Sequence, residues 1–282
     1  MTLHIGLLHP GKMGAALGAR LREKGVKVLW CSDGRSVTTA ERAEAAGLVA
    51  VTMQELSSRA DMIWSIVPPQ FAEDVAGSVA GLGFGGLYVD LNAIRPTRMH
   101  AIAATMTEAG AQVGDACVIG PPPVAPHTPP TRLFFAGSRA DWHRLEPLAH
   151  PGTFELRYVG DQLGSASALK IAQTGAQKLA RVAAAISHAL AAEYGVQGEL
   201  TEAVAEWGHP AATPETLPHL APRAWRWRPE FDDLAQALDE VGLPSESARA
   251  MGDALTRWER FRGQEHLSLE QVLDALTITE ED

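Results

Sequence analysis

Short apolar runs alternate with longer helix-like segments through the first 160 residues of the chain. Such alternation predicts a parallel β-sheet with helices on both faces, and nearly continuous apolar runs are typical of buried parallel strands. The predicted strands are Leu3–Leu8, Val26–Cys31, Leu48–Val51, Met62–Val67, Gly86–Asn92, Gln112–Ile119, Arg132–Ala136 and Phe154–Val159, and the predicted helices are Met13–Lys24, Thr38–Ala46, Phe71–Ala80 and Pro96–Ala109.

The composition of the chain changes after Gly160. From Gly164 to Tyr194 there is no proline, alanine is frequent, and apolar residues recur at spacings of three and four. This periodicity predicts one long helix, in which Gly175 costs about 1 kcal/mol relative to alanine without forcing a break. The segments that follow it are helical and punctuated by proline. We therefore expect an α/β domain over residues 1–160 and an all-α domain over residues 161–282, joined by the long helix.

Charge and composition exclude several classes of function. The net charge of −10 argues against a protein that binds the backbone of nucleic acids. We expect no membrane span, because no run of about 18 apolar residues occurs, and the absence of a leader pattern favours a cytoplasmic location. Cys31 and Cys117 are expected to be buried as small apolar residues. The ten histidines lack metal-site spacing, so no catalytic metal is expected.

The stretch IGLLHPGKMGAALG, Ile5–Gly18, joins the first strand to the first helix. Gly11 and Gly14 stand at the second and third glycine positions of a dinucleotide-binding turn, and the pair His9-Pro10 replaces the first. The free N–H groups of the helix could then bind a pyrophosphate. The alternative is an ordinary turn with packing glycines, and His9 could contact the pyrophosphate or only pack. The residues predicted to bind the cofactor here are His9, Pro10, Gly11, Lys12 and Met13.

The second strand ends in polar residues that bear on the choice of cofactor. NAD-binding proteins usually carry an acidic residue there to accept from the ribose 2′-OH. In this chain Ser32, Arg35 and Ser36 can donate to a 2′-phosphate, and Arg suits phosphate geometry. Asp33 would repel that phosphate if it pointed inward. We therefore expect NADP, with NAD as the alternative.

Two further strand ends add candidates. Val67 ends the fourth predicted strand, Pro68 and Pro69 follow it, and these three residues are predicted to shape the cofactor cleft. Asn92 follows the strand that contains YVDL, at the carboxyl end where α/β sheets place their ligands. We expect Asn92 to reach the nicotinamide end of the cofactor or the substrate.

Five motifs carry a resemblance to a known group of proteins: IGLLHPGKMG, SIVPP, YVDLNAIRP, GDACVIGPPP and GSASALKIAQTGAQK. Together they resemble the β-hydroxyacid dehydrogenase and 6-phosphogluconate dehydrogenase superfamily over nearly the whole chain. The second half is similar to a branch with a phosphogluconate-dehydrogenase-like C-terminal domain of unassigned substrate. The resemblance implies a Rossmann-type domain, a small-molecule substrate, and a homodimer formed through the helical domain.

The resemblance also implies a general acid/base. The superfamily opens its long helix with a G-x-x-x-x-x-K motif that Gly164 and Lys170 match, and this lysine exchanges a proton with the substrate. A salt-bridging helix lysine is the alternative. This chain departs from the superfamily at Thr174, where asparagine is frequent, and at Gly120-Pro121, where serine followed by glycines often holds a carboxylate. The candidate substrate residues are Gly120, Pro121, Thr174, Lys178 and Trp227.

The segment PRAWRWRPEF, Pro222–Phe231, alternates aromatic residues with arginine. Such a cluster suits an interface anchor or a substrate lid, and core packing is the alternative. The function expected from all these features is an NADP-dependent oxidoreductase that moves a hydride between nicotinamide and a small polar hydroxy or carbonyl substrate, with Lys170 and Asn92 as catalytic residues. The alternatives are an imine reductase on the same scaffold and a non-catalytic NADP(H) sensor.

Overall fold

The computed structural model describes residues 2–127, 129–193, 195–206, 213–240, 242 and 245–277. The chain divides into two compact units, Met1–Lys170 and Ile171–Asp282. The change of composition at Gly160 lies within the first of them, because the start of the long helix packs with the α/β unit.

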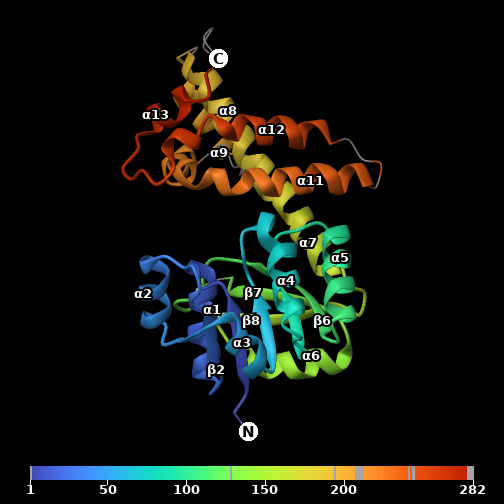
Figure 1. Ribbon diagram of the computed structural model, residues 1–282. Coiled ribbons are helices and arrows are strands. Elements are labelled where there is room, and N and C mark those ends of the chain that lie inside the picture. The colour runs from blue at the N-terminus through green and yellow to red at the C-terminus, as the bar shows by residue number, and fades with distance from the viewer. Residues whose placement is uncertain are drawn as a thin grey trace. The chain divides into compact units, whose positions relative to one another are not determined.

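The first unit is built on one mixed sheet (Figure 1). Its strands are β1 (His4–Leu8), β2 (Lys27–Cys31), β3 (Val49–Val51), β4 (Met62–Ser65), β5 (Leu87–Asp90), β6 (Gln112–Ile119), β7 (Thr131–Ala136) and β8 (Phe154–Gly160). Its helices are α1 (Lys12–Glu23), α2 (Val37–Ala45), α3 (Met53–Arg59), η1 (Pro69–Phe71), α4 (Ala72–Gly81), α5 (Pro96–Glu108), α6 (Arg139–Leu145), η2 (Glu146–Leu148) and the start of α7 (Ser165–Thr174).

The strand order is β3-β2-β1-β4-β5-β6-β7-β8, and the strands from β3 to β6 pair in parallel. The expectation of a fully parallel sheet is wrong at one place, because β7 runs antiparallel to β6 and β8 follows the direction of β7. A parallel return needs a crossover, usually a helix. The proline-rich stretch GPPPVAPHTPP between β6 and β7 cannot supply one, because proline breaks helices.

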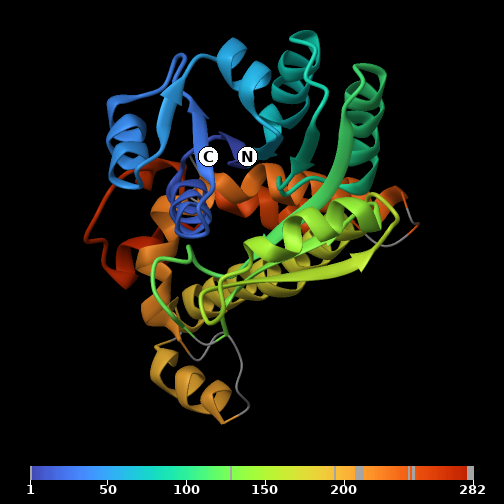
Figure 2. The same ribbon diagram turned by 90° about the horizontal axis from the view of Figure 1, so that it is seen from below.

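Helices cover both faces of this sheet, as the alternation predicts. One apolar core joins the sheet to α1 and α6 through Leu17, Leu21, Trp142 and Leu145. The other face packs against α3, α4 and α5, with Leu56 of α3 fully buried. Figure 2 separates the two layers, with α4 and α5 on one side and α6 on the other. Both cysteines are buried and free, as expected.

Two short helices of the first unit, α3 and α6, were not predicted from the sequence. A capping box starts α3, since the Thr52 hydroxyl accepts from Glu55 N and the Glu55 carboxylate accepts from Thr52 N. Ser138 caps α6 by accepting from Asp141 N. Both caps follow patterns visible in the sequence, but the helices have seven residues each, too few to show a clear periodicity.

The second unit is helical throughout the part that the structure describes. It contains the end of α7, the π-helical turn η3 (Gly175–Leu179), α8 (Ala180–Glu193), α9 (Gln197–Ala205), η5 (Pro214–Thr216), α10 (Leu217–Leu220), η6 (Ala221–Trp227), α11 (Arg228–Glu240), α12 (Glu246–Thr256), η7 (Glu259–Phe261) and α13 (Leu269–Asp274). Helices α11 and α12 lie side by side (Figure 1). The predicted long helix is thus interrupted by a π-helical turn that begins at Gly175.

The core of this unit includes Phe231 and Leu234 of α11 and Trp258, which lies between α12 and η7. Trp258 is fully buried and its indole N–H donates to the Val272 carbonyl at 2.8 Å. Across the described ranges, no helix has the length and apolar character needed to cross a bilayer.

Candidate active site

The predicted cofactor turns meet where the strand order of the sheet changes direction. The sheet extends from β1 to β2 and β3 on one side and from β4 to β5 and β6 on the other. Leu8 pairs with Ser65 in register, and His9 N donates to the Ile66 carbonyl at 3.3 Å. The segments His9–Met13 and Val67–Pro69 therefore lie together at the carboxyl edge of the sheet, which is where doubly wound folds bind their ligands.

The two glycines of the first turn have different surroundings. A Cβ atom at Gly14 would clash with the carbonyl oxygen of His9, so only glycine lets α1 pack this closely on the turn. A Cβ atom at Gly11 would meet nothing within 4 Å. Gly11 N donates to His9 O at 2.9 Å, which closes the turn although His9-Pro10 replaces the usual first glycine. The space beside Gly11 remains open to a ligand.

The N-terminus of α1 is prepared for a negative group. None of the described side chains caps this helix, and its first turn carries no acidic residue. The N–H groups of the first turn are therefore available to an anion, which the helix dipole also favours.

His9 adds a neutral donor to this turn. Burial, and to a smaller extent the positive charge of Arg35, lowers the pKa of His9 to about 4. Its Nδ1 atom is buried and has no hydrogen-bond partner among the described residues. A buried polar atom without a partner is costly, so a bound group that pairs with it would relieve that cost. The turn thus fits the phosphate end of a dinucleotide.

Most of the polar residues after β2 form hydrogen bonds within the protein, and Arg35 is exposed. Asp33 accepts from Met53 N at 2.8 Å, so its carboxylate binds the start of α3. The Ser32 hydroxyl donates to the Val51 carbonyl at 3.2 Å, and Ser36 caps α2 by accepting from Thr39 N. Arg35 is exposed and close enough to His9 to affect its pKa. Of the three predicted 2′-phosphate ligands, Arg35 alone has its side chain fully available.

Arg42 is a residue of this site that the sequence analysis missed. Its Nη1 atom donates to the Pro10 carbonyl at 3.3 Å, which ties α2 to the cofactor turn. In the sequence Arg42 is one of several charges on a short amphipathic helix, and nothing local distinguishes it. It brings a second guanidinium to the same edge of the sheet as Arg35.

Asn92 is buried, and protein atoms use both ends of its amide. Its Oδ1 atom accepts from Val67 N at 2.6 Å, and its Nδ2 atom donates to Asp90 Oδ2 at 2.7 Å. Asn92 therefore ties the end of β5 to the turn after β4 and positions Val67. Burial raises the pKa of Asp90 to about 7, against the lowering effect of its bonds to Asn92. The contact of Asn92 with nicotinamide or substrate stays a prediction.

Pro68 and Pro69 continue from that turn into η1. Pro68 is exposed, and the Pro69 carbonyl accepts from Arg98 Nη2 at 2.7 Å. Arg98 also pairs with Glu73 of α4. These bonds fix the path of the chain after β4, so the proline pair forms a stiff rim beside the cofactor turn.

Lys170 is held by strand β6. Its Nζ atom donates to the Val118 carbonyl at 3.0 Å, near the carboxyl end of that strand. The nearby Cys117 thiol has its pKa raised to about 12, chiefly by burial, so it stays protonated at neutral pH. The thiol is therefore no nucleophile, and the partly buried Lys170 ammonium keeps further N–H donors beyond the one that Val118 accepts.

Asp115 holds the helix that carries Lys170, and the sequence analysis missed it. It accepts from Ala166 N at 2.9 Å, from Ser167 N at 3.2 Å and from Ser167 Oγ at 2.7 Å. Burial raises the pKa of Asp115, and these bonds oppose that rise. The signal was an acidic residue inside the otherwise apolar run of β6. Such a residue is rarely buried without a partner.

Gly120 and Pro121 lie directly after β6. Gly120 has a φ angle of +129°, and a Cβ atom there would lie 2.9 Å from Thr131 Cα. Glycine is required at this close approach. The Pro121 carbonyl accepts from the Thr131 hydroxyl. Both residues are exposed beyond the end of the strand that holds Lys170.

The other three candidate substrate residues cluster within the helical unit. Lys178 forms an ion pair with Glu230, and Thr174 Oγ1 donates to the same carboxylate at 3.3 Å. Lys178 Nζ lies 5.2 Å from the centre of the Trp227 ring. Glu230 was not predicted as a site residue, although it belongs to the segment PRAWRWRPEF. Because Glu230 neutralises Lys178, an anionic substrate group would have to share this ammonium with the glutamate.

The described part of the chain holds no group of three or more His, Cys, Asp or Glu side chains that could bind a metal ion. The candidate site thus consists of a dinucleotide turn, two arginines and a lysine fixed on β6.

Comparison with known proteins agrees with this geometry. Residues 4–159 match the family model of the NAD-binding domain of 6-phosphogluconate dehydrogenase, and residues 191–258 match a domain of unknown function, DUF1932. A search of curated proteins gives no match. The first match spans more than half of the chain. The chain therefore belongs to the family defined by this NAD-binding domain, and it is an NAD(P)-dependent oxidoreductase.

Solved structures share the fold over nearly the whole length. The 3-hydroxyisobutyrate dehydrogenase of Mycobacterium tuberculosis, solved with L-serine, has a TM-score of 0.76 at 18% identity and covers 99% of this chain and 100% of its own. An imine reductase of Streptomyces aurantiacus has a TM-score of 0.59 at 20% identity, covering 98% and 100%. A reductive aminase of Aspergillus terreus, solved with NADPH4, cyclohexanone and allyl amine, has a TM-score of 0.61 at 16% identity, covering 98% and 100%.

Proposed function

We propose that this protein is an NADP-dependent oxidoreductase that transfers a hydride between nicotinamide and a small polar hydroxy or carbonyl substrate, with Lys170 as the general acid/base. The observation that carries the proposal is the hydrogen bond of 3.0 Å from Lys170 Nζ to the Val118 carbonyl. It fixes an otherwise flexible ammonium at the carboxyl edge of the sheet that holds the dinucleotide turn. A fixed proton carrier beside a cofactor site is what hydride transfer to a carbonyl requires.

When bound, the nicotinamide cofactor supplies the hydride. The first turn of α1 and the open space at Gly11 receive its pyrophosphate. Arg35 and Arg42 favour a 2′-phosphate, since each guanidinium matches phosphate oxygens. The Asp33 carboxylate accepts from Met53 N at 2.8 Å, so it is engaged at the start of α3. These positions support NADP over NAD.

Lys170 has three N–H bonds when protonated, and the Val118 carbonyl accepts one of them. The others can donate to the substrate oxygen, where negative charge develops as hydride arrives at carbon. In the reverse direction the neutral amine takes the hydroxyl proton. Asp115 acts through the backbone of α7, because its three bonds fix the start of the helix that positions Lys170.

Titration of the purified protein with NADPH and with NADH, followed by nicotinamide fluorescence, tests the cofactor half of the proposal. Micromolar NADPH binding with much weaker NADH binding is expected. Equal or tighter NADH binding would overturn the choice of NADP. Binding of neither cofactor would overturn the proposed function as a whole.

An imine reductase is the second candidate. The observation that favours it is the replacement of the carboxylate-holding serine and glycines by Gly120-Pro121, which leaves a hydroxyacid without its usual anchor. Solved proteins of similar fold include an imine reductase and a reductive aminase. Parallel assays with NADPH on 3-hydroxy acids, ketones and cyclic imines separate the two reactions. NADPH binding without turnover of any substrate would instead support the non-catalytic sensor.

The proposal includes a homodimer that pairs the helical domains, as the family resemblance implies, and a cytoplasmic location. Light scattering on the purified protein gives the mass directly. A monomer across micromolar concentrations would contradict this part alone and leave the hydride-transfer proposal standing.

A further inference from the structure

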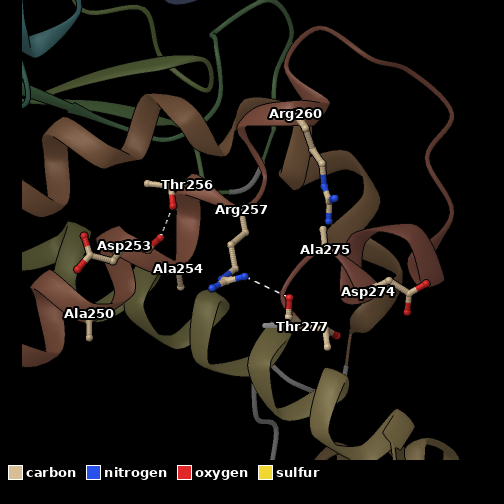
Figure 3. Close-up of a pocket in the computed structure, with 9 residues that line it drawn as sticks. All are labelled: Ala250, Asp253, Ala254, Thr256, Arg257, Arg260, Asp274, Ala275 and Thr277. Carbon is tan, nitrogen blue, oxygen red and sulfur yellow. Dashed lines mark hydrogen bonds between the residues drawn. The ribbon is translucent and has the colours of Figure 1, made fainter. Parts of the chain in front are cut away.

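Two hollows lined by described residues of the helical unit differ in charge. The larger has a volume of about 940 Å³, and Figure 3 shows the residues that line it. Arg257 and Arg260 face this hollow together with Asp253 and Asp274, so its charged side chains balance. Arg257 Nη1 also donates to the Thr277 carbonyl at 3.1 Å. This hollow offers no net attraction to an ion.

The smaller hollow, of about 350 Å³, is lined by Arg181, Arg223, Arg226, His219, Thr216 and Trp227. Its lining contains three guanidinium groups and no carboxylate. None of these three arginines forms an ion pair with a described residue. In a chain whose net charge is −10, this concentration of positive charge is a local exception.

The chain brings these residues together by helical spacing. Thr216, His219, Arg223 and Arg226 follow one another at intervals of three and four, from the end of η5 through α10 and η6. Residues at these spacings share one face of a helix, and in a 3₁₀-helix residues three apart are nearly eclipsed. Arg223 and Arg226 therefore lie side by side. Arg181 reaches the same hollow from α8.

Like charges held side by side repel one another, and the acidic residues close by in the chain do not relieve this. Glu230 is committed to Lys178 and Thr174. Glu215 adjoins Thr216 in the chain but does not line the hollow. The Trp227 ring forms an apolar wall, and Lys178 lies 5.2 Å from its centre. The hollow thus combines several oxyanion donors, one hydroxyl and one flat apolar wall.

We propose that this hollow is a binding site for an oxyanion, a phosphate or carboxylate group carried by a small molecule. Guanidinium forks match the oxygens of both groups and bind them with paired, charge-assisted hydrogen bonds. The volume of this hollow, about 350 Å³, is close to the lower limit of about 300 Å³ for small-molecule sites, so it suits a compact ligand. The inference does not rest on the proposed hydride transfer, because it uses residues of the helical unit alone.

Isothermal titration with inorganic phosphate and, separately, with succinate tests the site, with chloride keeping the ionic strength constant. Saturable binding of at least one anion is expected. The anion that binds more tightly shows whether the ligand group is a phosphate or a carboxylate. Arg223→Gln and Arg226→Gln should each weaken it by about 10-fold or more, as loss of a charge-assisted bond predicts. All three arginines are exposed, so the variants should fold, and circular dichroism checks this.

Two control variants define the site. Arg260→Gln changes an arginine of the charge-balanced hollow and should leave anion binding unchanged. Arg59→Gln changes an exposed arginine of α3, outside the hollow and the cofactor turn, and should also leave it unchanged. The proposal is overturned if the wild type binds neither anion saturably, or if the double variant Arg223→Gln/Arg226→Gln binds as tightly as the wild type. NADPH affinity measured on the same variants keeps this outcome separate from that of the cofactor proposal.

Discussion

Lys170 and Val118 are joined by a hydrogen bond of 3.0 Å from the lysine Nζ to the valine carbonyl oxygen. Three residues before Val118 on the same strand, Asp115 holds the start of the helix that carries Lys170. One strand therefore sets both the position of the helix and the place of its ammonium group. This arrangement is the basis of the predictions that concern the proton.

Replacing Lys170 by methionine should lower turnover by about 10²-fold to 10⁴-fold, which is the usual contribution of general acid/base catalysis. Methionine keeps most of the side-chain volume but carries no proton. NADPH affinity should stay within a factor of about three, because the lysine bonds to β6 and not to the cofactor turn. Single-turnover rates and fluorescence titration check the two expectations. Lys24→Met, at the exposed end of α1, is the matched control, and an unchanged rate in Lys170→Met would exclude the proposed role.

Removal of the Asp115 carboxylate should destabilise the start of α7. Asp115→Ala leaves the Ala166 and Ser167 donors without an acceptor, and each unsatisfied buried group costs about 1–3 kcal/mol. Asp115→Asn keeps one carbonyl oxygen as an acceptor, so it should lose less stability than Asp115→Ala. Urea unfolding of both variants measures the difference, with Asp161→Asn as an exposed control. Equal stability of Asp115→Ala and the wild type would show that these bonds do not hold the helix.

Gly11 and Gly14 should respond differently to the same change. Gly14→Ala places a methyl group against the His9 carbonyl, so it should lower the melting temperature. Gly11→Ala meets no protein atom within 4 Å and should leave stability nearly unchanged, while its methyl group occupies the space reserved for the pyrophosphate. Thermal unfolding and NADPH titration of the pair separate packing from binding. Full NADPH affinity in Gly11→Ala would argue against a pyrophosphate at this place.

His9 should add a pH-dependent contribution to stability. Its folded-state pKa is lowered to about 4 from an ordinary value of 6.5. Between these values the unfolded state binds more protons, so the stability contributed by His9 rises with pH and is complete above about 6.5. Denaturant unfolding from pH 4 to 7 should show that His9→Gln loses this rise. His143→Gln, on an exposed histidine of α6, is the control and should keep the slope of the wild type.

Arg35 should govern the preference for NADP. Arg35→Gln is expected to weaken NADPH binding by about 10-fold, since a charge-assisted bond to phosphate is lost. NADH affinity should not fall, because NADH has no 2′-phosphate. The ratio of the two dissociation constants is the measurement. A parallel loss for both cofactors would place Arg35 at the pyrophosphate, and no loss for either would remove it from the site.

Much of the first unit could be predicted because its elements are local patterns. The apolar runs of β1, β4 and β6 and the glycines of the first turn are each contained within a few neighbouring residues, and such periodicity is the strongest signal in a sequence. The carboxyl-edge position of His9 and Val67 follows from the order of strands and helices. Short helices such as α3 were not predicted, because seven residues are too few to show a clear periodicity.

The pairs that complete the candidate site could not be predicted in the same way. Arg42 bonds to Pro10, Ser167 to Asp115 and Lys178 to Glu230, and in each pair the partners lie far apart in the sequence. Which charged side chain finds a distant acceptor depends on how helices pack on strands. A local pattern shows a charge but not its partner.

The sequence by itself determined the alternation of strand and helix, the dinucleotide turn and the change to an all-helical second half, since these depend on the spacing of apolar residues and glycines along the chain. Only the tertiary structure decided that β7 runs antiparallel to β6, that Asn92 supports Val67, and that β6 holds Lys170 through Val118 and Asp115. The physical reason is that buried polar groups must be satisfied by whichever partners folding brings near them. Those partners are set by the packing of whole elements.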